Sequence, residues 1–334
     1  MSKKIFITGG AGYVGSLLVP YLLKRNYEVT VYDIMYFTDI FLPKNNNKLK
    51  IVKGDIRDKQ KLNDAIKGHD TFVNLACISN DTSFALNEKL STSINLDAFR
   101  PMVSIAKKNG IQRFIYASTS SVYGVSKKKN VTEEHPLVPL TLYNKYKAMC
   151  EPILLEMTDN NFEGVIFRPA TVCGYAPRLR LDLSVNILTN FAVNKEYIKV
   201  FGGEQLRPNL HILDYCKVVE LLINAESSKI KNEIFNVGYQ NLSIMQIAQL
   251  VKKVVQKKFP KKKEIAILKE QSNDKRSYHI NSDKIQKVLN FRPSKTIESA
   301  VEDLCEAFQE KKIPFSFDKD IYFNVNRLKN IEAK

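Results

Sequence analysis

A glycine-rich loop constrains the fold of this chain more than any other sequence feature. The residues TGGAGYVG at 8–15 follow the apolar run KKIFIT and open an amphipathic stretch that begins at about residue 13. A strand, a G-x-G-x-x-G turn and a helix in this order are typical of a dinucleotide site at the start of a βαβ unit. Glycines let the backbone approach a pyrophosphate, and the helix N-terminus then holds that group. We expect the dinucleotide to contact Gly9, Gly12, Tyr13 and Val14.

The first half of the chain alternates short β-branched runs with longer amphipathic stretches. The expected strands are 3–8, 28–32, 49–52, 70–75, 112–117 and 163–167, and the expected helices are 13–25, 58–67, 84–108 and 141–157. Such alternation indicates βαβ units and a parallel sheet covered on both faces. A helix at 214–226 and a strand at 233–236 continue the pattern. The sequence therefore predicts an α/β fold, a Rossmann-type doubly wound parallel sheet with a smaller, less regular C-terminal domain.

Composition limits the classes of partner. The chain has 51 basic and 35 acidic residues, a formal net charge of +16, and 44% hydrophobic residues. The hydrophobic share is enough for a sizeable core and excludes an intrinsically disordered chain. Most of the basic residues are lysines, which favours a solvated surface with a general attraction for anions. We expect no specific nucleic-acid partner.

Cysteine and histidine spacing, together with hydropathy, excludes further classes. The five cysteines and four histidines are scattered, with no C-x-x-C pair, so neither a disulfide framework nor a metal site is expected. The most apolar stretch, 17–23, falls far short of the roughly 20 residues that a membrane span needs. The N-terminus has no signal-peptide pattern. We expect reduced thiols, no membrane association and a cytoplasmic location.

Acidic residues at two expected strand ends are candidates for the rest of the dinucleotide site. Asp33 ends the second strand, 18 residues after Gly15, where a carboxylate accepts hydrogen bonds from ribose hydroxyls and repels a 2′-phosphate. No arginine follows it directly, so the sequence favours NAD over NADP. Asp55 and Ile56 end the third strand and would lie beside the adenine, although a turn role for Asp55 fits the sequence equally well.

A Y-x-x-x-K pair supplies the candidate chemistry. Tyr143 and Lys147 are four residues apart on an expected helix, so their side chains share one face. A nearby ammonium stabilises a phenolate, and we therefore expect Lys147 to lower the pKa of Tyr143 toward that of a general base. Upstream, the segment YASTSSVYG at 116–124 ends a strand, and its hydroxyls are candidates to bond a substrate alcohol.

These segments together resemble a known family. TGGAGYVG, GDIRD, NLA at 74–76, STSSVYG at 118–124, YNKYK at 143–147 and FRPATVCG at 167–174 occur in order at familiar spacing. Over about residues 1–310 the chain is similar to the extended short-chain dehydrogenase/reductases, specifically the NAD-dependent epimerase/dehydratase family acting on nucleotide sugars. The resemblance implies an NAD-binding Rossmann domain at 1–172 plus about 210–240, and a nucleotide-sugar-binding domain at 173–209 and 241–334. It also implies a homodimer packed through the helices at about 84–108 and 141–157.

The resemblance implies a role for individual residues. Tyr143 would take the proton of the sugar C4 hydroxyl, Lys147 would hold the nicotinamide ribose, and Thr119 would bond the same hydroxyl. Further cofactor contacts are expected from Leu75, Ala76, Asn95 and Ser118. Substrate contacts are expected from Ser79, Asn80, Thr119, Thr171, Arg178, Arg180, Asn186, Arg207 and Arg276.

Departures from the family pattern bear on the reaction. The 4,6-dehydratases of the family carry an acid pair directly after the catalytic Thr, whereas this chain has Ser120 and Ser121. Thr171 stands where the family usually has Asn, so the standard diphosphate contact is in question there. The expected activity is NAD-dependent oxidoreduction at C4 of a nucleotide-activated sugar, foremost 4-epimerisation. The alternatives are a 4-dehydrogenase, for example on a GDP-linked heptose, then a 4,6-dehydratase, and a non-catalytic NAD-binding scaffold or regulator.

Overall fold

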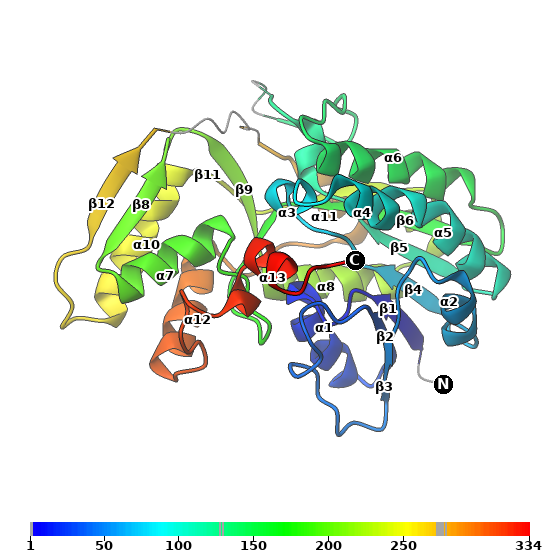
Figure 1. The fold of residues 1–334 in the computed structure, drawn as a ribbon. Helices are drawn as coiled ribbons and strands as arrows, with labels where there is room; N and C mark the ends of the chain where they lie inside the picture. Colours follow the sequence, from blue (N-terminus) through cyan, green and yellow to red (C-terminus); the bar gives the residue numbers. More distant parts are fainter. Residues whose placement is uncertain (1–2, 127, 129, 272–276, 278) are drawn as a thin grey trace.

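A parallel sheet forms the centre of the molecule in the computed structural model, which describes residues 3–126, 128, 130–271, 277 and 279–334 (Figure 1). Within these residues the sheet has seven strands in the order β10-β6-β5-β4-β1-β2-β3, and all neighbours are parallel. Their bounds are β1 Lys4–Thr8, β2 Glu28–Asp33, β3 Leu49–Lys53, β4 Thr71–Asn74, β5 Arg113–Ala117, β6 Glu163–Pro169 and β10 Ile234–Val237. The predicted Rossmann-type sheet is confirmed.

Helices cover both faces of this sheet because its strands are apolar on both sides. On one face, α1 (Tyr13–Leu23) packs on α8 (Ile212–Asn224) over a core that includes Ile5 and Ile7. On the other, α2 (Lys59–Ala65), α5 (Phe99–Lys108) and α6 (Leu142–Glu156) cover a core that includes Phe6. Alternate residues of one strand thus supply two different cores.

The helix expected at 84–108 is confirmed from Glu88 to Lys108, but its expected start is wrong and it contains a π-helical turn. The structure has α3 (Asp81–Phe84), α4 (Glu88–Thr92), a π-helical turn at Ser93–Asp97 and then α5. Asn80 and Asn87 each cap a new helix start, because their side-chain oxygens accept hydrogen bonds from the backbone N–H groups of Ser83 and Leu90.

A second lobe follows the sheet. Strands β7 (Thr171–Cys173), β9 (Leu206–His211) and β11 (Gln240–Ser243) form one small sheet, and β8 (Tyr197–Phe201) pairs with β12 (Ala266–Glu270). Helices α7 (Ser184–Asn194), α10 (Ile244–Lys258) and α12 (Ile297–Gln309) pack around a separate apolar core. Two short helices of the second half lie elsewhere: α9 (Ser227–Ile230) contacts β6, and α11 (Asp283–Leu289) contacts β10.

The last segment of the chain returns to the first lobe. After a 3₁₀ turn at Asp320–Tyr322, α13 (Asn324–Asn330) contacts α3, and its Leu328 joins the core below that helix. Figure 1 shows α13 in red, between the second lobe and the central sheet. The division of the chain into two domains stays a prediction, but the segment after residue 320 contacts both lobes.

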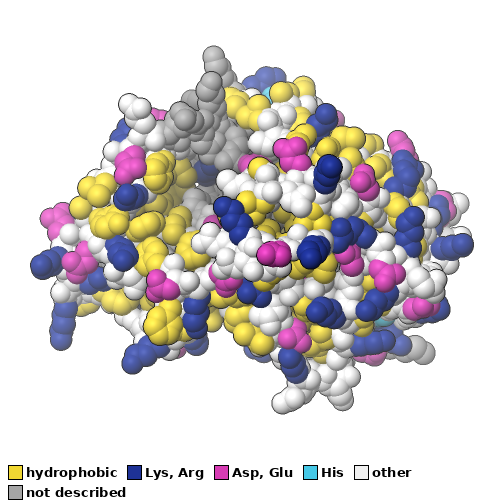
Figure 2. All heavy atoms as spheres, viewed as in Figure 1, with side chains coloured by type: hydrophobic (Ala, Val, Ile, Leu, Met, Phe, Trp, Pro, Cys, Tyr) yellow, Lys and Arg dark blue, Asp and Glu magenta, His cyan; other side chains and the backbone are white. Residues whose placement is uncertain are grey.

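Charged side chains are dispersed over the surface. Figure 2 shows Lys and Arg side chains spread over one face, interleaved with Asp and Glu. In the part of the chain that the structure describes, no helix is long and apolar enough to cross a membrane. The same residues contain no cluster of three or more His, Cys, Asp or Glu side chains that would hold a metal ion.

Candidate active site

A cavity of about 700 Å³ lies at the carboxyl ends of the central strands. The strand order reverses between β1 and β4, and ligands of open α/β sheets bind at such a reversal. The walls come from the loops after β1, β2, β3, β4 and β5, from the second lobe, and from α13. Its volume lies within the range of small-molecule sites.

The glycine loop forms one wall of this cavity. Gly9 has φ +74°, and a Cβ there would lie 2.6 Å from the backbone N of Ala76. The loop after β1 therefore touches the loop after β4 directly, which only glycine permits. The wall also includes Gly12, Tyr13, Val14, Leu75 and Ala76.

Asp33 is fixed beside that loop. Its Oδ2 accepts a hydrogen bond from the N–H of Ala11 (2.9 Å) and its Oδ1 from the N–H of Met35 (2.8 Å). Burial nevertheless raises the pKa of Asp33. Asp55 and Ile56 also line the cavity, and Asp55 forms an ion pair with Arg57. A glycine cradle with a carboxylate at its edge fits a dinucleotide.

Tyr143, Lys147, Ser118 and Thr119 line the same cavity. The Nζ of Lys147 donates to the carbonyl oxygen of Ala117 at 2.7 Å. Burial raises the pKa of Tyr143 well above its usual value, the nearby Cys77 and Asp81 raise it further, and the charge of Arg180 lowers it. The effect of Lys147 on Tyr143 stays a prediction, whereas Arg180 is a cation that acts on this phenol.

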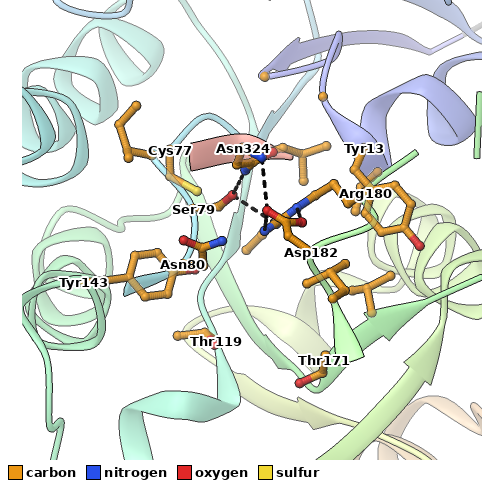
Figure 3. A pocket seen from close by; sticks show the side chains of 18 of the residues that line it. Tyr13, Cys77, Ser79, Asn80, Thr119, Tyr143, Thr171, Arg180, Asp182 and Asn324 are labelled. Atoms are coloured by element: carbon orange, nitrogen blue, oxygen red, sulfur yellow. Dashed lines mark hydrogen bonds and ion pairs between the residues drawn. The ribbon is translucent and has the colours of Figure 1, made fainter. Parts of the chain in front are cut away.

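A polar network crosses the cavity wall beside Tyr143 (Figure 3). Arg180 forms an ion pair with Asp182 (2.9 Å) and donates to the Oγ of Ser79 (3.1 Å). Asn324 of α13 donates from Nδ2 to the same Oγ (3.0 Å) and from its backbone N–H to Asp182 (3.1 Å). The network therefore joins the loop after β4 to the second lobe and to α13.

The structure brings most of the predicted substrate residues into this cavity. Its lining includes Ser79, Asn80, Thr119, Thr171, Arg178, Arg180 and Arg207. Figure 3 shows Asn80 and Thr119 on the side of the cavity where Tyr143 lies. Arg276 lies outside the described residues.

Two of the predicted residues lie behind the cavity wall. The amide of Asn95 accepts from the N–H of Ile78 and donates to its carbonyl, so it fixes the loop after β4. Asn186 accepts from the N–H of Gly174 and donates to the carbonyl of Arg180. Both side chains support residues of the wall.

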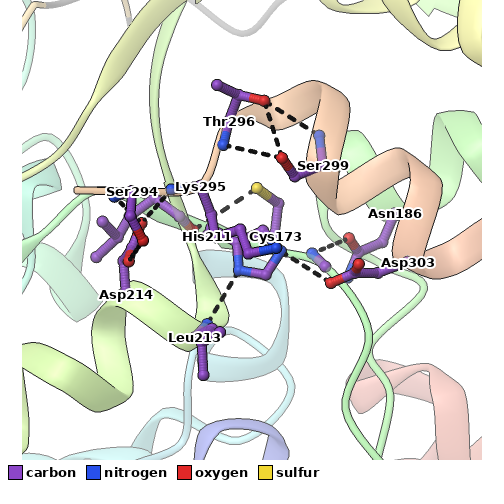
Figure 4. A network of polar contacts seen from close by, with 12 residues as sticks. Cys173, Asn186, His211, Leu213, Asp214, Ser294, Lys295, Thr296, Ser299 and Asp303 are labelled. Carbon is purple, nitrogen blue, oxygen red and sulfur yellow. Dashed lines mark hydrogen bonds and ion pairs between the residues drawn. The ribbon is translucent and has the colours of Figure 1, made fainter.

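Asn186 belongs to a region of polar contacts between the two lobes (Figure 4). His211 stands at the start of α8, and its Nδ1 accepts a hydrogen bond from the N–H of Leu213. Its Nε2 lies 3.1 Å from Asp303 of α12. Asp214 accepts from the N–H groups of Ser294 and Lys295, each at 2.8 Å. These contacts hold the second lobe against the sheet beside the cavity.

Several residues that line the cavity were not predicted from the sequence. They are Tyr36, Phe37, Cys77, Asp182, Asn324 and Leu328. Asp182 stood two residues from Arg180 in the run RLRLD, which was a usable signal. Asn324 had none, because its place in the wall depends on contacts with residues more than 140 positions away, and Leu328 lies on the same helix.

The fold and the cavity together define a dinucleotide-dependent enzyme of the Rossmann type. Comparison with known proteins makes this specific: the chain belongs to the NAD dependent epimerase/dehydratase family, whose pattern matches residues 5–238. Its cofactor is NAD.

Three similar proteins illustrate the range of the family. The chain is 25% identical to the low-salt glycan biosynthesis protein Agl12 of Haloferax volcanii (89% of this chain, 96% of the relative) and 24% identical to UDP-glucose 4-epimerase 2 of Arabidopsis thaliana (91% and 94%). The dTDP-glucose 4,6-dehydratase DesIV of Streptomyces venezuelae, solved with NAD bound, superposes with a TM-score of 0.81 at 21% identity (92% and 98%). Relatives that catalyse different reactions share one fold. Membership of the family therefore identifies the cofactor but does not identify a single reaction.

Proposed function

We propose that the protein catalyses NAD-dependent oxidoreduction at C4 of a nucleotide-activated sugar, with 4-epimerisation as its net reaction. The observation that carries the proposal is the location of Tyr143 and Thr119, whose hydroxyl-bearing side chains line the cavity that also holds the glycine loop and Asp33. A sugar hydroxyl between them loses its proton to Tyr143 while Thr119 hydrogen-bonds its oxygen. The glycine loop and Asp33 would hold NAD, which would supply the hydride acceptor for C4 and then the hydride donor for the keto sugar.

The cations around Tyr143 support its role as a base. A buried phenol holds its proton, so a positive charge has to stabilise the phenolate. Arg180 supplies such a charge, and the ammonium of Lys147 lies at the carbonyl of Ala117, beside the strand end where the nicotinamide ribose is expected. Arg207 and Thr171, on the second lobe, are our candidates for the substrate's diphosphate end.

Epimerisation is favoured over dehydration by the residues after Thr119. Elimination of water needs an acid and a base beside the sugar, and Ser120 and Ser121 supply neither.

Product analysis tests the proposal. The purified protein is incubated with a panel of UDP-, dTDP-, GDP- and CDP-sugars, products are identified by NMR, and NADH is followed by absorbance. We expect a C4 epimer of one sugar without net NADH. A keto sugar formed together with NADH would instead identify a 4-dehydrogenase, and loss of water a dehydratase. Failure to oxidise or epimerise any sugar, with NAD bound, would overturn the substrate class.

A further inference from the structure

Arg178 is a buried cation that forms no ion pair within the described residues, although the charges of Asp182 and Asp33 partly oppose the lowering of its pKa by burial. Its side chain is only 1% exposed. Its Nη2 donates to Oδ1 of Asn324 at 2.6 Å, while its Nε has no hydrogen-bond partner in the structure. A charge without a counter-ion is costly to bury, so this guanidinium is arranged for an anion that binds in the cavity it lines.

The surroundings of Arg178 fix where that anion lies. The backbone N–H of Arg178 donates to the Oγ of Ser16 in the first turns of α1, directly after the glycine loop. Its guanidinium carbon stacks 3.7 Å from the ring centre of Phe37, four residues beyond Asp33. Arg178 therefore spans from the start of α1 to the end of β2. This is the half of the cavity where the glycine fingerprint places a dinucleotide's diphosphate and adenosine ribose.

We propose that Arg178 binds the diphosphate of NAD, opposite the backbone N–H groups of the glycine loop. The family resemblance implies a substrate contact for Arg178, whereas its position in the cavity favours the cofactor. The inference rests on the cofactor alone and stands whether or not the sugar reaction proposed above is correct. Burial, followed by the charge of Arg180, lowers the pKa of Arg178 to about 9, while Asp182 and Asp33 act in the opposite direction.

Asn324 is the positioning residue for this cation. It is buried, and its side-chain oxygen accepts from Arg178 while its Nδ2 donates to Ser79. With Phe37 below the guanidinium, the side chain of Arg178 is held on two sides. The segment after residue 320 thus becomes part of the cofactor site, a role that no local sequence pattern indicated.

The test compares ligand binding and stability in Arg178→Met, which removes the charge and keeps an apolar stem over Phe37. Nucleotide-free protein is titrated calorimetrically with NAD, with adenosine and with UDP. Losing one partner of a buried charge pair predicts an NAD affinity about 30-fold weaker or more, with adenosine and UDP affinities unchanged. The Tm without NAD should stay equal or rise, because an unpaired buried charge has been removed.

Two further variants separate charge from structure. Arg178→Lys keeps the charge and should recover part of the NAD affinity. Arg25→Met removes another arginine that stacks on an aromatic ring, at 3.6 Å from the ring centre of Tyr21 but outside the cavity, and should leave NAD affinity unchanged. Unchanged NAD affinity in Arg178→Met would overturn the proposal. Loss of UDP affinity with NAD affinity intact would also overturn it, and would assign Arg178 to the substrate.

Discussion

At the scale of single residues, the protonation of Tyr143 decides whether the proposed oxidation can start. Burial raises the pKa of its phenol well above the usual value, Cys77 and Asp81 raise it further, and the charge of Arg180 acts in the opposite direction. The chemistry therefore depends on a balance between burial and charges contributed by the second lobe and by the loop after β4.

Replacing Tyr143 with Phe should abolish most turnover and leave NAD binding intact. Loss of a general base typically costs 10²–10⁴-fold in rate, while the ring keeps its packing. The measurements are kcat on the substrate found in the panel and the Kd of NAD. Tyr146→Phe is the matched control, since Tyr146 lies on the same helix, packs against Phe84 and does not line the cavity. Near-normal turnover in Tyr143→Phe would refute the base assignment.

Replacing Arg180 with Met should move the pH dependence of turnover. Arg180 lowers the pKa of Tyr143, so its removal raises that pKa, and the phenolate fraction at neutral pH falls. The charge of Asp182, left without its partner, acts in the same direction. We expect slower turnover at neutral pH and a rising limb of the kcat–pH profile that shifts to higher pH. Arg180→Lys should keep the limb near its original position. A uniform loss at every pH would show that Arg180 only positions the substrate.

At the scale of secondary-structure elements, α6 is held to the sheet by a buried ionic network. Arg168 of β6 and Glu151 of α6 form an ion pair whose side chains are each 3% exposed, and Glu151 also accepts from the Oγ of Ser118 at 2.6 Å. Because Tyr143 and Lys147 lie on the same helix, this network fixes their position relative to the end of β5.

Replacing Glu151 with Gln should destabilise the fold strongly. Removing one partner of a buried pair leaves an uncompensated charge at Arg168, which costs about 3–5 kcal/mol in the free energy of unfolding. Glu156→Gln is the control on the same helix, since its pair with Arg100 is more than half exposed and contributes up to about 1 kcal/mol. Urea unfolding followed by circular dichroism measures both. Similar losses in the two variants would show that burial does not control the strength of these pairs.

The sequence predicted some secondary-structure elements better than others. Elements that depend only on residues close together in the sequence were predicted best. The strand expected at 28–32 is β2, Glu28–Asp33, because a run of β-branched residues defines a buried parallel strand. The start expected at residue 84 was wrong because Asn80 caps a separate short helix and Asn87 caps a new helix start at Glu88. Capping depends on side-chain geometry at one position, which hydropathy does not record.

At the scale of the whole molecule, the site is assembled from parts that are distant in the sequence. The glycine loop and Asp33 could be predicted because both belong to one βαβ unit of neighbouring residues. The contact of Asn324 with Ser79 joins residues 245 positions apart, and no local pattern specifies such a pair. The cofactor half of the site was therefore predictable, whereas the part contributed by α13 required the structure.

Oligomeric state is the last prediction, and it concerns the surface rather than the cavity. The family resemblance implies a homodimer packed through the regions of α5 and α6, and Met149 of α6 is 41% exposed there. Met149→Glu should shift the protein to a monomer, because a charge buried in an apolar contact without a partner costs more than the contact contributes. Leu268→Glu on β12, where Leu268 is 45% exposed, is the control and should leave the dimer intact. Light scattering measures the mass against the 38.2 kDa of one chain, and a wild-type protein of that mass would refute the dimer.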